Sequence, residues 1–144
     1  MLEDHSNIFV ADASVLYKWA AFEPELFTQA MAFRRAWIQD EITIVVPAHC
    51  YTEISNTIGG KNSDFALSFL SNLIFSQIIQ YQLSLEVAAI AFNLMKKYKK
   101  ISFYDACYHA LAIHLKGVFV TADDSYFKTT KKEKHIMRLS DYQT

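Results

Sequence analysis

Four acidic residues of this chain have types and positions suited to metal-ion chemistry: Asp12, Glu53, Asp105 and Asp123. Each falls where a predicted strand gives way to a helix, or in the first turns of such a helix. In an open α/β sheet, ligands bind in crevices at the carboxyl ends of the parallel strands. Carboxylates that converge in one crevice repel each other, and a divalent cation or shared protons must offset that cost. The four positions therefore predict a metal site.

Each acid also has an ordinary structural explanation. Asp105 and Asp124 occupy the fourth positions of capping-box patterns, and Asp12 and Asp123 fall near helix N-termini, where the helix dipole favours an anion. Glu53, taken by itself, could simply be an exposed helix residue. The conjunction of the four favours a site, since Asp105 has mainly apolar and aromatic neighbours, which suit a merely solvated acid poorly.

Short apolar runs mark the strands that would carry these acids. The predicted strands cover residues 8–10, 42–46 and 118–121, with a final strand at 135–139. Helices that separate such strands imply right-handed parallel crossovers. The predicted fold is an α/β protein, a three-layer α/β/α sandwich with a mainly parallel central sheet of four or five short strands.

Helical spacing of apolar residues and local capping signals place the helices between these strands. Ser84 and Ser102 are suited to N-caps, and Gly59 with Gly60 is expected to end the helix that begins at Pro47. The predicted helices run over 14–22, 24–39, from 47 to the glycine pair, from 62 or 63 past 74, 84–98 and 102–115, with a short one after 121.

The composition predicts one cytoplasmic domain over residues 1–144. Cys50 and Cys107 are too few and too far apart for a disulfide framework, and the acidic amino terminus does not resemble a secretory signal. Residues 65–85 carry no charge, but eight of these 21 residues are Ser, Asn or Gln, which disfavours a membrane span. This segment is instead the best candidate for a protein interface, with deep core as the alternative.

At four places, in order, the chain resembles the PIN-domain nucleases, and in particular the VapC-like toxins of toxin–antitoxin pairs. The matching stretches are VADAS at 10–14, TEISN at 52–56, FYDACYHALA at 103–112 and VTAD at 120–123. The resemblance implies that Asp12, Glu53, Asp105 and Asp123 form a pocket for Mg²⁺ or Mn²⁺. It also implies that three polar residues orient the acids or bind a metal-bound water: Ser14, Asn56 and Thr121.

The function implied is a metal-dependent endoribonuclease that hydrolyses RNA phosphodiester bonds with water activated at the metal. Its expected partners are RNA, a cognate antitoxin protein and a second copy of the chain in a homodimer. A PIN nuclease of RNA maturation or decay and a non-catalytic binding module are the alternatives. A haloacid-dehalogenase-like phosphatase is disfavoured because it needs a second acid where this chain has Ser14.

Secondary candidates surround these acids. Asp124 is expected to be a helix cap rather than a ligand. His49 lies four residues before Glu53, and His109 lies four after Asp105, so each pair shares a helix face. We expect packed or hydrogen-bonded imidazoles, because no further nitrogen or sulfur ligand completes a zinc set.

Charge is distributed unevenly along the chain. Residues 1–95 carry 4 basic and 10 acidic side chains, whereas residues 96–144 carry 10 basic and 5 acidic ones. A polyanion should therefore prefer the second part. Candidate phosphate contacts are Lys128, Lys131 and Lys132, with a further lysine cluster at 96–100; a merely solvated surface is the alternative.

Overall fold

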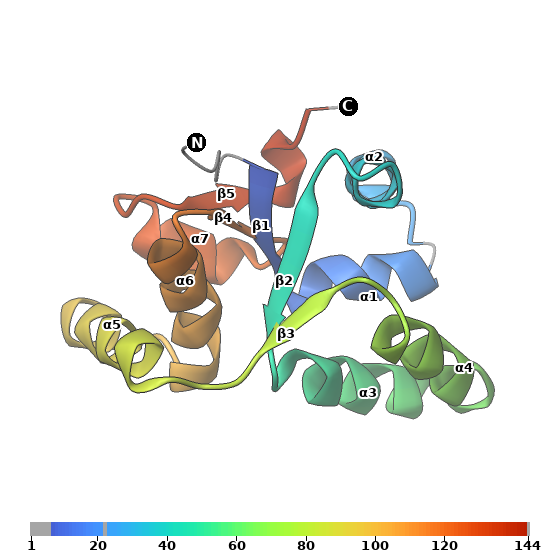
Figure 1. Ribbon diagram of the computed structural model, residues 1–144, viewed down its shortest axis with the longest axis horizontal. Helices are drawn as coiled ribbons and strands as arrows, with labels where there is room; N and C mark the ends of the chain where they lie inside the picture. Colours follow the sequence, from blue (N-terminus) through green and yellow to red (C-terminus); the bar gives the residue numbers. More distant parts are fainter. Residues whose placement is uncertain (1–6, 22, 144) are drawn as a thin grey trace.

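A parallel five-stranded sheet forms the centre of the computed structural model, which describes residues 7–21 and 23–143 (Figure 1). The strands lie in the order β3-β2-β1-β4-β5, and each neighbouring pair is parallel. This confirms the predicted α/β sandwich with a parallel sheet. The strands are β1 (Ile8–Ala11), β2 (Thr43–Pro47), β3 (Ile79–Tyr81), β4 (Val118–Thr121) and β5 (Ile136–Arg138).

Helices cover both faces of this sheet. Figure 1 shows α5 and α6 on one side, and α1 to α4 on the other. The helices are α1 (Ala13–Ala21), α2 (Phe27–Ile38), α3 (Cys50–Lys61), α4 (Ser63–Ile74), α5 (Leu85–Lys97), α6 (Phe103–Leu115) and α7 (Asp124–Thr130), followed by the 3-10 turn η2 (Leu139–Asp141). Within the described residues, none of these helices is long and apolar enough to traverse a lipid bilayer.

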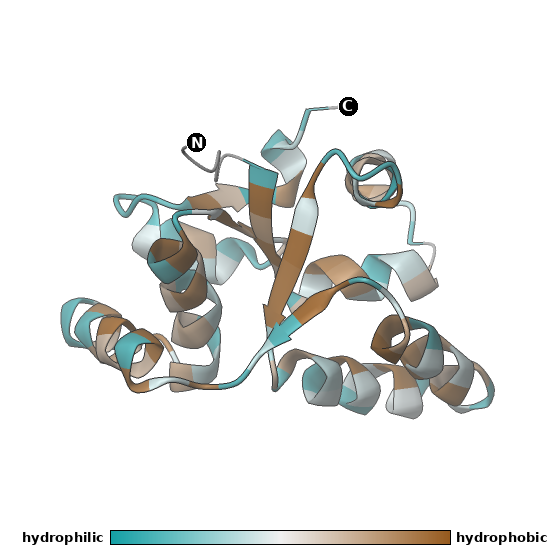
Figure 2. Ribbon diagram, in the orientation of Figure 1, coloured by the Kyte–Doolittle hydropathy of each residue, from teal (hydrophilic) through white to brown (hydrophobic). Residues whose placement is uncertain are grey.

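The core lies between the sheet and the helices. The central strands are mostly apolar, as expected of strands covered on both faces, and Figure 2 shows much of β1 and β2 in brown. Val10, Ile44 and Val120 are fully buried. On the α1–α2 side, Trp19 stacks on Trp37 with ring centroids 5.4 Å apart. This packing fixes the strand ends at which the acids lie.

The predicted helix N-termini are confirmed where a side chain caps the helix. The Ser84 hydroxyl accepts a hydrogen bond from Val87 N at 3.2 Å, and the Ser102 hydroxyl accepts one from Asp105 N at 3.1 Å. The predicted end at Gly59 and Gly60 lies within one residue of the observed end, since α3 runs to Lys61. Both glycines are helical, because glycine lowers helix stability without forbidding helical backbone.

The uncharged segment 65–85 contains the strand that the sequence analysis missed. It forms most of α4 and then β3, an edge strand whose three residues are all exposed. A strand of three residues is too short to show alternation, so only its pairing with β2 identifies it. The deep-core alternative is wrong for this segment, because large apolar side chains stand in solvent: Leu67, Phe75, Leu83 and Leu85 are 59–87% exposed.

Candidate functional site

The candidate site lies where β1 and β4 end side by side. The chain adds β2 and β3 on one side of β1 and then returns to place β4 on the other, so β1 and β4 form the topological switch point at which open sheets bind ligands. Asp12 directly follows β1, and Asp12 N donates to Val120 O at 3.0 Å. Asp123 follows β4 by two residues. Two acids distant in sequence are thereby brought to one edge of the sheet.

Asp12 is the buried centre of a hydroxyl network. Its Oδ2 accepts hydrogen bonds from Thr121 Oγ1 at 2.6 Å and from Ser14 Oγ at 3.0 Å. The Ser14 hydroxyl in turn accepts from Ala122 N, and the Thr121 hydroxyl accepts from Asp123 N. Ser14 and Thr121 therefore link the segment after β1 to the segment after β4.

Burial controls the acidity of Asp12. Loss of hydration raises the pKa of its carboxyl to about 6, against the two hydroxyl donors, which lower it, and with smaller contributions from the charges of Asp105 and Glu53. The carboxylate is therefore costly to keep ionised in the protein alone. A cation in the pocket would reduce that cost.

Glu53, on the first turn of α3, is held from two directions. His49 Nε2 lies 3.0 Å from Glu53 Oε1, although its geometry is not that of a hydrogen bond. Tyr108, fully buried on α6, donates its hydroxyl to the same oxygen at 3.3 Å. The sequence analysis missed Tyr108 as part of the site. Its position one turn after Asp105, on the same face of α6, was the available signal.

Asp105 and Asp123 complete the acidic set from two helix N-termini. Burial raises the pKa of Asp105, and the charges of Asp123 and Glu53 raise it further, against the Ser102 hydrogen bond. Asp123 is itself the N-cap of α7, since its Oδ1 accepts from Ser125 N at 3.0 Å and from Tyr126 N at 3.2 Å. The predicted cap at Asp124 is therefore wrong: Asp124 is the exposed first residue of α7 and does not line the pocket.

One pocket of about 490 Å³ collects these groups. Among its lining residues are all four predicted acids with Ser14 and Asn56, whereas Thr121 is buried behind Asp12. Two cations that the sequence analysis did not place there, Lys18 and Lys61, also line the pocket. Lys18 Nζ lies 3.3 Å from Glu25 O and 3.5 Å from Glu23 Oε2, so its charge is already paired.

The donor set suits a hard divalent cation. Within the described residues, no three His, Cys, Asp or Glu side chains stand close enough to hold one ion between them. Mg²⁺, however, keeps several waters and often contacts only one or two carboxylates directly. The hydrogen bonds described above use Oδ2 of Asp12 and Oδ1 of Asp123, which leaves the second oxygen of each for an ion or its waters. An all-oxygen pocket of this kind fits Mg²⁺ or Mn²⁺.

His109 takes no part in the pocket, in line with the expectation of a packed imidazole. It is fully buried, and burial lowers its pKa. Its Nε2 lies 2.8 Å from Lys134 O, so this nitrogen carries the proton and Nδ1 accepts from the Tyr126 hydroxyl at 3.0 Å. The backbone N–H of the same Tyr126 donates to Asp123 Oδ1. His109 is therefore linked to the acidic pocket through Tyr126.

The candidate phosphate-contacting lysines lie outside the acidic pocket. Lys128, Lys131 and Lys132 are exposed on α7 and the turn after it. Glu133 joins this turn to the end of α5, since it lies 3.1 Å from Lys97 Nζ and accepts from the Tyr98 hydroxyl at 3.1 Å. The turn after α7 therefore lies against the end of α5, where the other lysine cluster of the sequence begins.

A model of the PIN domain family matches residues 9–133, which include most of β1, all of β2, β3 and β4, the helices α1 to α7 and every acid of the pocket. The chain belongs to the PIN domain family. No curated protein matches it significantly in sequence.

Solved structures with the same PIN fold share little sequence with this chain. A toxin–antitoxin complex from Klebsiella pneumoniae has 15% identity and a TM-score of 0.69, covering 90% of this chain and 96% of that one. VapBC2 from Rickettsia felis, bound to a promoter DNA fragment, has 14% identity and a TM-score of 0.67, covering 91% and 96%. VapC20 from Mycobacterium tuberculosis, described as a toxin that cleaves the sarcin-ricin loop, has 14% identity and a TM-score of 0.63, covering 83% and 93%. At these identities the likeness concerns the fold.

Proposed function

We propose that this PIN domain is a metal-dependent endoribonuclease and the toxin of a toxin–antitoxin pair. The observation that carries the proposal is the convergence of Asp12, Glu53, Asp105 and Asp123 on one pocket at the switch point of the sheet. The similar folds of a Klebsiella pneumoniae toxin–antitoxin complex and of a toxin that cleaves the sarcin-ricin loop support a toxin over a nuclease of RNA maturation.

In this proposal each residue of the pocket has a defined task. When bound, Mg²⁺ or Mn²⁺ polarises the phosphate and lowers the pKa of water. Asp12, Asp105 and Asp123 hold the cation or its waters, and Glu53 completes the set from α3. Ser14 and Thr121 keep the Asp12 carboxylate oriented, whereas Tyr108 does so for Glu53. Asn56, one turn after Glu53, presents an amide to the same pocket.

The function is tested by cleavage of mixed RNA. We expect the purified chain to cleave RNA in Mg²⁺ or Mn²⁺, and we expect excess chelator to abolish cleavage. Asp105→Asn should lower the rate by at least about 100-fold, since it removes one preorganised charge from the site. Asp124→Asn is the matched control, because Asp124 does not line the pocket, and it should cleave normally. Equal cleavage by wild type, chelated wild type and Asp105→Asn would refute a metal nuclease.

We propose that the basic surface formed by Lys128, Lys131 and Lys132 contacts the phosphates of bound RNA. Its lysines are exposed, and Glu133 holds this turn against the carboxyl end of α5. Charge reversal at Lys131 and Lys132 should weaken RNA binding and reduce its dependence on salt concentration. An unchanged salt dependence would show that these lysines do not contact the phosphates of bound RNA.

We propose that the antitoxin occupies a second, largely apolar pocket of about 420 Å³ on the other side of α1. Its walls come from α1, α2 and α4 and include Trp19, Trp37 and Phe69, with Arg34 as a cation at the same place. An apolar helix or strand of a partner fits such a groove. Because α1 also lines the acidic pocket, a bound segment would lie next to the active site. Antitoxin binding that Trp37→Ala leaves unchanged would place the partner elsewhere.

We propose that the exposed apolar face around β3 is covered by a second copy of the chain. β3 pairs with β2 on one side only and forms an edge of the sheet that the described residues build, and it is flanked by Phe75 and Leu85, both 87% exposed. Such an edge is a template for association. Wild type should sediment as a dimer, and Phe75→Glu should be monomeric. Ile38→Glu, at an exposed apolar residue of α2, should stay dimeric. A monomeric wild type, or equal effects of both variants, would contradict this interface.

A further inference from the structure

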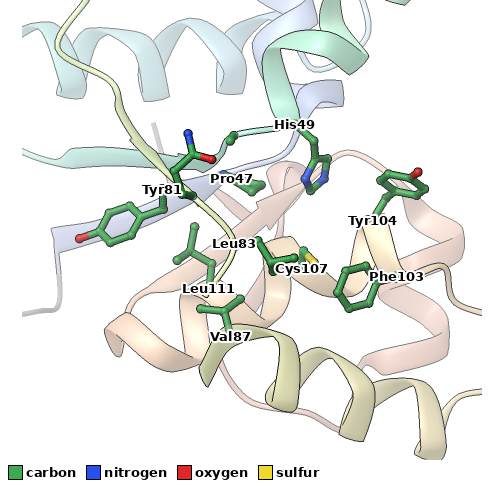
Figure 3. A pocket seen from close by; sticks show the side chains of 11 residues that line it. Pro47, His49, Tyr81, Leu83, Val87, Phe103, Tyr104, Cys107 and Leu111 are labelled. Carbon is green, nitrogen blue, oxygen red and sulfur yellow. The ribbon is translucent and has the colours of Figure 1, made fainter. Parts of the chain in front are cut away.

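A third pocket opens beside the acidic one, at the carboxyl ends of β2 and β3. It has a volume of about 250 Å³. Val87, Cys107 and Leu111 give it an aliphatic and thiol lining, and the segment that follows β3 closes one side (Figure 3). The Tyr81 carbonyl accepts a hydrogen bond from Ala48 N at 2.9 Å, which ties that segment to the end of β2. The pocket is therefore built on the rigid sheet edge.

This apolar pocket and the acidic pocket share a wall. Tyr104 lines the apolar pocket and the adjacent Asp105 lines the acidic one, so the first turn of α6 separates them. His49 lines the apolar pocket, and its Nε2 lies 3.0 Å from Glu53 Oε1 of the acidic pocket. If a phosphate of a polymer lay at the acids, the chemical group next to that phosphate could reach the apolar pocket, because only the first turn of α6 lies between the two pockets.

The rim of the apolar pocket is suited to a flat ring. Tyr104 and His49 pack edge to face, with centroids 5.6 Å apart and planes at 73°, and the Tyr104 side chain remains 65% exposed. Aromatic rings of this kind stack on nucleobases of any sequence. The Gln82 amide also lines the pocket and can make hydrogen bonds. Among the described residues, no Lys, Arg, Asp or Glu lines it, which suits an uncharged group and not a second phosphate.

We infer that this pocket binds one nucleobase of the RNA strand whose phosphate group lies at the acidic pocket. The inference rests on the proposed ribonuclease function. A volume of about 250 Å³ is at the small end for ligand sites, which suits one ring system and excludes a partner helix. The pocket would then set how the strand is oriented at the acids, and it would do so by stacking.

The inference is tested with a nucleoside that has no phosphate. In metal-free buffer, adenosine should shift the backbone amide resonances of residues 81–87 and of Tyr104, whereas ribose 5-phosphate should leave them unchanged. Tyr104→Ala should weaken adenosine binding about tenfold, and Tyr104→Phe should keep it, because the stacking ring is the contact removed. Phe65→Ala is the matched control, since Phe65 is an exposed aromatic residue on α4, away from this pocket. Tyr104 is exposed, so its truncation should not unfold the chain.

The outcomes separate this inference from the proposed function. RNA cleavage that Tyr104→Ala leaves unchanged, together with no adenosine shift at the pocket, overturns the base site and leaves the nuclease intact. Adenosine binding that depends on Tyr104 in a chain without nuclease activity supports the pocket and refutes only the nuclease. If Tyr104→Ala changes the sedimenting mass and not adenosine binding, a second copy of the chain fills the pocket, and the inference is wrong.

Discussion

Asp12→Asn should stabilise the metal-free protein and inactivate it. In the unfolded chain this carboxyl has a pKa of 3.8, and burial raises it to about 6 in the folded protein. Between these values the folded state binds more protons, so the free energy of unfolding falls as pH rises from about 4 to 6 and stays reduced above that window. A shift of this size corresponds to up to about 3 kcal/mol at pH 7.5. An amide carries no charge, and its oxygen can still accept from Thr121 and Ser14.

Thermal unfolding in chelator measures this effect. The melting temperature of Asp12→Asn should exceed that of wild type at pH 7.5, and the gap should shrink towards pH 4, where the wild-type carboxyl is protonated. Asp64→Asn, which replaces an exposed acid on α4, is the control and should show no such gain. Mg²⁺ should raise the melting temperature of wild type more than that of Asp12→Asn, because ligand binding adds to stability only where the site is intact.

The same substitution should abolish function. RNA cleavage by Asp12→Asn should fall at least about 100-fold, as expected when a preorganised charge at the reacting phosphate is lost. Induced expression of wild type should arrest growth, and Asp12→Asn should relieve the arrest. A variant that is less stable than wild type in chelator at pH 7.5 would contradict the assigned cost of the buried charge. Arrest by both proteins would mean that the acids do not cause toxicity.

Gly117→Ala should destabilise the fold by about 2 kcal/mol, the cost typical of forcing an atom into a packed site. A Cβ at Gly117 would lie 2.5 Å from Ile8 O and 3.0 Å from Ile8 Cγ2. The first of these is a backbone atom at the start of β1, so one of two paired strands must move. The requirement concerns space alone, because Gly117 does not have a positive φ; Lys116 takes the left-handed conformation at the end of α6.

Gly60→Ala is the matched control for this prediction. Gly60 lies inside α3, and a Cβ there meets nothing within 4 Å. Alanine at an exposed helix position should raise the free energy of unfolding by about 0.5–1 kcal/mol. Urea unfolding of the two variants should therefore give changes of opposite sign. Destabilisation of similar size in both would show that the contact with Ile8 is not the cause.

Much of the site could be predicted because its signals are local. An apolar run followed by an acid indicates where a strand ends, and Ser102 indicates where α6 begins. The positions of Asp12 and Asp105 can therefore be predicted from neighbouring residues. Serine caps are equally local, since the hydroxyl bonds an amide three residues on. The parallel sheet follows from helices that alternate with buried strands. These elements were recovered from the sequence for that reason.

The errors arose where a local signal competes with long-range packing, or where two adjacent residues fit the same signal equally well. Thr121 and Asp124 fit a capping box, but the Thr121 hydroxyl is engaged by Asp12, 109 residues away, and Asp123 becomes the cap of α7. Gly59 and Gly60, by contrast, mark the end of α3 to within one residue, because that signal is local. The cap of α7 could not be obtained without the long-range partner of Thr121.

The four acids of the candidate site could be found from the sequence, because they lie at element boundaries that neighbouring residues define. Only the tertiary structure decided how those acids are held and what lies beside them. Tyr108 reaches Glu53 from another helix, and the strand β3 exists through its pairing with β2. The pocket lined by Tyr104 and His49 likewise forms where α6 meets the ends of β2 and β3. Contacts between distant segments depend on how the strands and helices are arranged in space, and short sequence patterns do not specify that arrangement.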